Sequence, residues 1–183
     1  MALKSTIHKV NLQITNTDCD YYELHKITIA RHPSETDERL MIRLLAFALN
    51  ASSTLTFAGD ISEADQPAIW EKSRSGLIET WIEIGQPDEK IIRKACSNAR
   101  NVILYCFNLR RSQTWWNTIQ TKLERFKNLE VWLIPDGDEE KLEKLVQKNM
   151  QIDCRIQDQE VWISDKDVEI HLTPQVLKVA TSK

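Results

Sequence analysis

From residue 77 onwards the chain alternates short apolar segments with amphipathic segments, and this order constrains the fold more than any other feature. Residues 77–84 alternate as a strand does, and residues 102–107 form the near-continuous apolar run of a buried strand. Between them, Gln86-Pro87-Asp88-Glu89 begins a helix, because proline and acids suit a first turn. The pattern then repeats, with a helix over 112–126, a strand over 131–134 and a helix marked by Leu142, Leu145 and Val146. This order predicts right-handed crossovers and parallel strands at the centre of a sheet.

Both ends of the chain have the pattern of β-hairpins. Residues 3–14 and 24–30 carry alternating apolar side chains on either side of a polar turn. Near the other end, residues 161–163 and 168–172 flank a second polar turn, and residues 151–157 are expected to supply a third strand beside them. The two ends of the chain are therefore expected to add strands to the central sheet.

A helix is expected between the first hairpin and the alternating region. Ser34-Glu35-Thr36-Asp37 fits a capping arrangement in which the serine oxygen accepts an amide of the first turn, and an apolar stripe then runs to near Asn50. The predicted fold class is α/β, with a mixed β-sheet, flanking helices and additional N- and C-terminal β-hairpin strands. Because no long Gly/Ser/Pro linker divides the chain, residues 1–183 are expected to form a single domain.

Charge and apolar segments limit the class of protein. No apolar run approaches the roughly 20 residues that cross a bilayer, and the N-terminus has no apolar stretch of signal-peptide length, so we expect no membrane contact and a cytoplasmic location. The net charge of −3 lacks the basic surplus of nonspecific nucleic-acid binders, although a local basic face suffices for an enzyme that only visits nucleic acid. Because neither a Gly-rich phosphate loop nor the glycine fingerprint of dinucleotide binding occurs, we expect no organic cofactor.

Acidic side chains in and before the strand at 77–84 are candidates for chemistry. Glu79 and Glu83 point to one face of that strand, and its other face is apolar. Asp65 lies in an acidic loop upstream, and Glu38 lies at the start of the first helix. Mg²⁺ prefers such oxygen ligands, usually one or two carboxylates with water and substrate phosphate. A helix acid, a loop acid and a strand acid are therefore expected to converge.

Three stretches resemble the bacterial YaeQ family: Arg31-His-Pro-Ser-Glu-Thr-Asp-Glu-Arg, Trp81-Ile-Glu-Ile-Gly-Gln-Pro-Asp-Glu-Lys and Arg93-Lys-Ala-Cys. The likeness runs nearly end to end and includes Trp115-Trp116 and Val161-Trp162-Ile163-Ser164-Asp165. The resemblance implies a variation of the PD-(D/E)XK nuclease fold, whose core is a helix, a strand series and a crossover helix. It implies no established biochemical activity.

The resemblance assigns roles to several acids. Glu83 matches the acid of the (D/E)-x-K element, and Asp65 is the best match to the earlier aspartate of the nuclease pattern. Asp60 and Glu79 compete with Asp65 for that role. Glu38 matches the first-helix acid found in some members of the superfamily.

The lysine of the nuclease pattern is missing, because Gly85 occupies its position. A lysine there would stabilise charge on the attacked phosphate or help to activate water. Lys94, or less readily Lys90, could replace it from the following helix, as such lysines migrate in some relatives of this superfamily. Otherwise Gln86 substitutes in part, or the site is inactive.

Two functions follow from these residues. In the first, the protein is a phosphodiesterase acting on nucleic acid with Mg²⁺ or Mn²⁺, in which Asp65 and Glu83 bind the metal. Glu38 or Glu79 would assist, and Lys94 would supply positive charge. In the second, it is a binding or regulatory module that keeps the nuclease fold without catalysis. The clustered acids favour the first function, whereas the missing lysine and the acidic net charge favour the second.

Simpler interpretations exist for several of these side chains. Glu38 would stabilise the helix N-terminus, Glu79 would face solvent or pair with a neighbouring strand, and Lys94 would be a surface lysine. The pair Trp115-Trp116 is placed to stack bases next to Arg110-Arg111, or else to divide between the core and a half-exposed position.

Overall fold

The computed structural model describes residues 4–58, 66–136 and 141–181. The chain folds into two compact units, one made of Met1–Ala51 and Asp136–Pro174 and the other of Ser52–Pro135 and Gln175–Lys183. We call them unit 1 and unit 2. The chain therefore passes between the units three times. The single domain expected over residues 1–183 stays a prediction.

Unit 1 contains a five-stranded sheet in the order β10-β9-β8-β1-β2. Its strands are β1 (Thr6–Asn16), β2 (Tyr21–Arg31), β8 (Asn149–Gln157), β9 (Glu160–Ser164) and β10 (Glu169–Leu172). The hairpins predicted at both ends are confirmed, since β1 pairs antiparallel with β2 and β9 pairs antiparallel with both β8 and β10. Parallel pairing of β1 with β8, which sets Leu12 opposite Ile152, joins them into one mixed sheet.

Helix α1 (Asp37–Leu49) packs in unit 1 against β8 and the short 3-10 helix η1 (Leu142–Leu145). Its residues from 40 to 48 are all buried. Two expectations are corrected here. The cap of α1 is Thr36, whose hydroxyl accepts the amide of Arg39 at 3.2 Å, and not Ser34. The helix expected at residues 142–146 is a four-residue 3-10 turn, too short to form an α-helix.

Unit 2 contains a six-stranded sheet in the order β11-β7-β6-β5-β4-β3. Its strands are β3 (Leu55–Phe57), β4 (Ile69–Lys72), β5 (Ile78–Ile84), β6 (Ala99–Phe107), β7 (Leu129–Ile134) and β11 (Gln175–Lys178). Strands β5, β6 and β7 are parallel, as the strand and helix alternation predicts, and the other pairs are antiparallel. Strand β5 lies inside the sheet between β4 and β6, which confirms its predicted central place.

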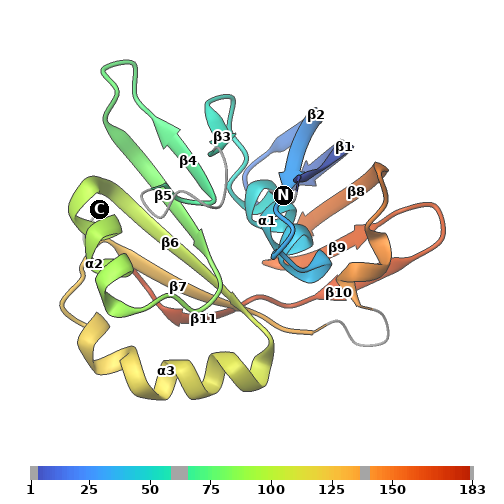
Figure 1. The fold of residues 1–183 in the computed structure, drawn as a ribbon. Helices are drawn as coiled ribbons and strands as arrows, with labels where there is room; N and C mark the ends of the chain where they lie inside the picture. Colours follow the sequence, from blue (N-terminus) through green and yellow to red (C-terminus); the bar gives the residue numbers. More distant parts are fainter. Residues whose placement is uncertain (1–3, 59–65, 137–140, 182–183) are drawn as a thin grey trace. The chain divides into compact units, whose positions relative to one another are not determined.

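Helices α2 (Glu89–Asn98) and α3 (Leu109–Leu123) cover one face of the unit 2 sheet (Figure 1). Ile92 and Ala95 of α2 and the apolar side of α3 form a common core with Trp81, Val102 and side chains of β7. Because side chains alternate along a strand, Trp81 places Glu83 on this helix-covered face as well. Ile82 and Ile84 lie on the other face and are buried, as predicted.

The α/β class is confirmed, but the strands form two mixed sheets rather than the single sheet expected from the sequence. The terminal hairpins pair with each other through β1 and β8 and do not add to the central strands. The backbone groups at a strand edge are the same in the terminal hairpins and in the central strands. Alternation of apolar side chains alone therefore does not specify which strand pairs with which. None of the helices in the described ranges is long and apolar enough to cross a bilayer.

Candidate functional site

Glu83 is the predicted site residue with the most constrained surroundings. It lies one residue before the end of β5, half-buried on the face that α2 and α3 cover, and opposite Leu104 of β6. The indole N–H of Trp81, two residues earlier, donates to Glu83 Oε2 at 3.3 Å. A carboxylate partly removed from water needs such donors or a cation. The sheet therefore holds this carboxylate close to the start of the crossover helix.

Gly85 directly follows β5 and is buried with a φ of +106°. Its amide donates to the carbonyl of Tyr105 at 2.9 Å, which keeps the loop in line with β6. A Cβ on Gly85 would meet Phe107 Cε1 at 3.9 Å, so the site has room for a side chain. The backbone angle is what favours glycine, since residues with a Cβ rarely adopt it. The backbone at the position of the missing lysine therefore has a conformation that favours glycine.

Gln86 ties the loop after β5 to the end of β6 and the start of α3. Its Nε2 donates to the carbonyl of Phe107 and to Ser112 Oγ, the latter at 3.0 Å. The next carbonyl, that of Pro87, accepts the indole N–H of Trp115 at 2.8 Å. Gln86 therefore connects the loop after β5 to the start of α3. That it substitutes in part for the lysine stays a prediction.

The two candidate lysines lie on α2. The helix starts after Asp88, whose carboxylate accepts the amide of Ile91 at 3.0 Å, so Pro87 precedes the cap and is not in the first turn. Lys90 and Lys94 are both exposed. Glu89 contacts Lys122 near the end of α3 and Arg125 just beyond that helix. Lys94 follows Glu89 by five residues, or about 140° around the helix. Lys94 therefore lies on a different side of α2 from Glu89. That its ammonium reaches Glu83 stays a prediction.

Glu79, the competing acid, has a partner on the neighbouring strand. Its carboxylate lies 3.6 Å from Nη1 of Arg100 on β6, and its backbone carbonyl accepts a hydrogen bond from the side-chain Nδ2 of Asn101 at 3.3 Å. These contacts agree with the interpretation of Glu79 as an acid that pairs across to the next strand.

The convergence of Glu38, Asp65 and Glu83 stays a prediction. Asp65 and its competitor Asp60 lie outside the described residues. Glu38 is half-buried in the first turn of α1 in unit 1, whereas Glu83 belongs to unit 2. Among residues 4–58, 66–136 and 141–181, no group of three or more His, Cys, Asp or Glu side chains is placed to hold a metal ion.

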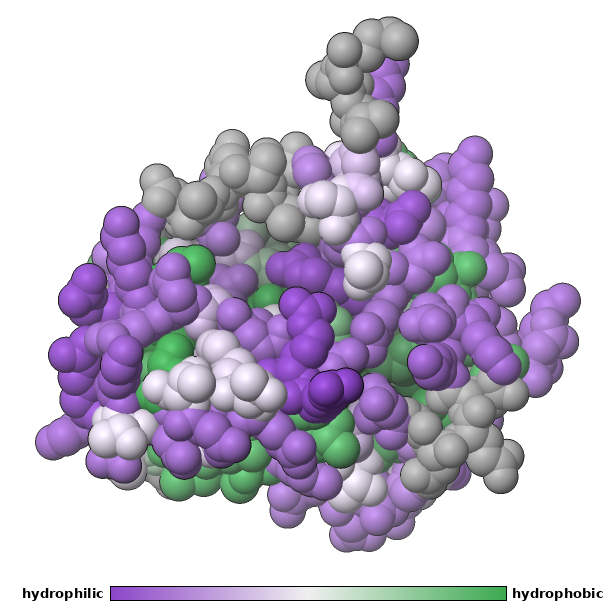
Figure 2. Space-filling view, turned by 60° about the horizontal axis from the view of Figure 1, so that its bottom comes forward, coloured by the Kyte–Doolittle hydropathy of each residue, from purple (hydrophilic) through white to green (hydrophobic). Residues whose placement is uncertain are grey.

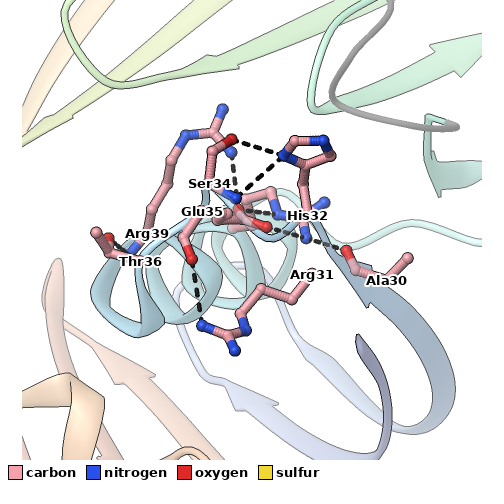
Figure 3. Close-up of polar contacts among 8 residues, drawn as sticks. Ala30, Arg31, His32, Ser34, Glu35, Thr36 and Arg39 are labelled. Carbon is pink, nitrogen blue, oxygen red and sulfur yellow. Dashed lines mark hydrogen bonds and ion pairs between the residues drawn. The ribbon is translucent and has the colours of Figure 1, made fainter. Parts of the chain in front are cut away.

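A charge cluster around the buried Glu35 holds the start of α1 (Figure 3). The Glu35 carboxylate accepts Arg39 Nη1 at 2.7 Å and Arg43 Nη2 at 2.9 Å, and it lies 2.8 Å from Arg43 Nε. Arg43 Nη2 also donates to the carbonyl of Ala30 at 2.6 Å, and Arg31 Nη1 donates to the Glu35 carbonyl at 3.2 Å. The cluster thereby connects the end of β2 to two turns of α1.

Sequence reasoning missed this cluster, although one signal was present. Arg43 is the one charged residue inside the otherwise apolar segment 40–48, and a buried arginine requires a nearby acid. Glu35 is buried with its side chain 1% exposed, and Arg43 is 2% exposed. Burial lowers the pKa of Arg43, and the carboxylate of Glu35 opposes that shift.

A solvent-open pocket of about 580 Å³ lies along α3. Its lining residues are Gln86, Arg110, Arg111, Thr114, Trp115 and Thr118. Trp115 and Trp116 are both half-buried, with ring centroids 6.0 Å apart and planes at 39°, so neither ring is fully in the core. The pocket places an aromatic ring beside two arginines at the carboxyl ends of β5 and β6.

Comparison with known proteins agrees with the resemblance in the sequence. The family model described as "YaeQ protein" matches residues 1–174. The chain is 41% identical to a YaeQ protein of Salmonella typhi and 39% identical to one of Escherichia coli K12, each over 94% of this chain and 97% of the relative.

Two crystal structures of YaeQ proteins are similar over almost the whole chain. The structure from Xanthomonas axonopodis pv. citri has a TM-score of 0.88 at 38% identity and covers 95% of this chain and 98% of its own. The structure from Pseudomonas syringae has a TM-score of 0.89 at 31% identity and covers 97% and 98%. The chain therefore belongs to the YaeQ family.

Proposed function

We propose that the protein is a metal-dependent phosphodiesterase that acts on nucleic acid. The observation that carries this proposal is the position of Glu83, half-buried with an indole donor at the end of the central strand β5 and directly before the crossover helix α2. In chain order, α1, β3, β4, β5, α2 and β6 fit the helix, strand series and crossover helix of the PD-(D/E)XK core. Similarity of fold alone does not assign an activity, so the proposal rests on the site.

Mg²⁺ or Mn²⁺ would be held by Glu83 together with Asp65, and Glu38 would assist. Glu83 fits this role chemically, since a carboxylate offers the oxygen ligands that both ions accept. When bound, the ion would lower the pKa of a water molecule and polarise the phosphate. Lys94, an exposed residue of the crossover helix α2 that follows β5, would supply the positive charge that Gly85 cannot.

The alternative function is a binding module that keeps the fold without catalysis, and Gly85 favours it. The φ of +106° at Gly85 makes the position unsuited to a lysine, and the side chain of Gln86 beside it donates a hydrogen bond to Ser112. In this case the chain would bind its partner without cleaving it.

A cleavage assay separates the two functions. Purified protein is incubated with single- and double-stranded DNA and RNA in Mn²⁺, in Mg²⁺ and in EDTA. The proposal predicts metal-dependent cleavage that Glu83→Gln and Lys94→Ala each abolish while the domain stays folded. Loss of one metal ligand or charge stabiliser typically lowers such a rate by about 10²-fold or more.

Glu130→Gln is a matched control for Glu83→Gln. Glu130 is also a half-buried strand glutamate that accepts an indole N–H from a tryptophan two residues away, here Trp132 Nε1 at 3.2 Å. It lies on β7 and has no role in the proposal, so its variant should cleave as the natural protein does. Cleavage that survives Glu83→Gln would indicate a contaminating nuclease, and absence of cleavage on every substrate would favour the binding module.

A further inference from the structure

Two arginines and a tryptophan form one side of the first turns of α3. Arg110 and Thr114 are four residues apart, as are Arg111 and Trp115, so their side chains follow each other along neighbouring rows of the helix. All four line the pocket of about 580 Å³, which is within the size range of pockets for small ligands. Figure 2 brings the bottom of Figure 1, where α3 lies, towards the viewer, and hydrophilic side chains cover most of its coloured surface.

The charge of Arg110 and Arg111 is not neutralised within the described part of the chain. Both side chains are exposed, and neither forms an ion pair there. At the other end of α3, by contrast, Lys122 and Arg125 both contact Glu89. The first turn of α3 also carries the positive end of the helix dipole. On a chain with a net charge of −3, this pair is a local site of positive charge suited to an anion.

The ring of Trp115 is held in a fixed orientation in the same pocket. Its Nε1 donates to the carbonyl of Pro87 at 2.8 Å, and one side of the ring system is next to Trp116. The hydroxyls of Thr114 and Thr118 donate to carbonyls of α3 itself. The indole N–H is therefore occupied, and what Trp115 offers a ligand is aromatic surface. A ring that is already ordered loses little entropy when a ligand stacks on it.

We propose that this surface binds single-stranded nucleic acid, with phosphates on Arg110 and Arg111 and an unstacked base against Trp115. Arginine pairs with phosphate through two parallel hydrogen bonds, and base stacking on an aromatic side chain does not depend on sequence. The bases of a duplex are already stacked on one another, so none of them would be available to stack on Trp115. The inference rests on the proposed function in that it names the substrate class, but it uses none of the residues of the cleavage site.

Binding is tested without cleavage by fluorescence anisotropy of a labelled 12-nucleotide single strand in EDTA. The full chain is compared with Arg110→Ala/Arg111→Ala and, as a control of equal net charge, with Lys122→Ala/Arg125→Ala at the far end of α3. We expect the first pair of changes to weaken binding at least tenfold. The slope of log affinity against log salt should fall by about 1.4, since each phosphate contact of a single strand contributes about 0.7. The control should bind as the natural chain does.

Trp115→Leu should weaken binding about tenfold and Trp115→Phe much less, because phenylalanine keeps a stacking face. Thermal unfolding shows whether each variant is folded, and the arginine variants keep the proposal testable if Trp115→Leu is not. Absent binding, equal weakening by both charge pairs, or preference for a duplex of the same length would overturn the inference. Binding that depends on the arginines without any cleavage would refute the phosphodiesterase alone, whereas cleavage without that dependence would refute the inference alone.

Discussion

Replacing Glu35 by glutamine tests the buried cluster that holds the start of α1. Glutamine keeps the shape of the side chain but removes the charge, and its NH₂ group would face guanidinium donors that now lie 2.7 to 2.9 Å from a carboxylate. Arg43, whose side chain is only 2% exposed, would lose its counter-ion. Removing one partner of a buried pair costs about 3–5 kcal/mol, and we expect a loss of this size in the stability of unit 1.

Hydrogen exchange of the α1 amides measures this loss in unit 1 directly, and chemical denaturation measures it for the whole chain. The control is Asp37→Asn, which breaks the 2.9 Å pair with Arg31 at a carboxylate 46% exposed. An exposed pair contributes about 0–1 kcal/mol, so this variant should be close to the natural protein. A cost for Glu35→Gln below 1 kcal/mol, or equal to that of the control, would refute the reasoning. Glu35→Leu combined with Arg43→Met should recover much of the stability, because apolar residues replace the buried pair.

Two further predictions concern backbone strain and thiol reactivity. Gly85→Ala should destabilise the protein by about 1–3 kcal/mol in chemical denaturation, because alanine at a φ of +106° is strained although its Cβ has room. Unchanged stability would contradict the positive φ at this position. In a thiol titration of the native protein at pH 8, only the exposed Cys19 should react quickly, and all four cysteines should react after denaturation. Burial raises the pKa of the other thiols, to about 11 for Cys96 and about 12 for Cys106 and Cys154, so their reactive thiolates are scarce below those values. More than one fast thiol would refute this assignment.

Local parts of the fold could be predicted because neighbouring residues decide them. The alternating pattern at 77–84 became β5, and the hairpins at both ends formed where polar turns interrupt apolar alternation. The cap of α1 shows the limit of such reasoning. Ser34 and Thr36 are both residue types that cap helices. Glu35 between them is buried in its ion pair with Arg43, and the helix begins after Thr36.

The partition into two sheets depends on pairing between distant segments. β1 and β8 are about 140 residues apart in the chain, and residues 175–178, which carry no clear strand signal, form β11 on β7. A strand's own side chains indicate which face is buried but not which edge it joins, because backbone hydrogen bonds are the same for every partner.

For the candidate site, the sequence by itself determined which chemical groups are available: an acid at Glu83, a glycine in place of the nuclease lysine, and a pair of arginines beside tryptophan. Only the tertiary structure decided their surroundings. It half-buries Glu83 under the helices with an indole donor, pairs Glu79 with Arg100, and leaves the two arginines of α3 exposed in a pocket. The physical reason is that residue type sets a group's chemistry, whereas its burial and partners depend on packing between elements that are far apart in the chain.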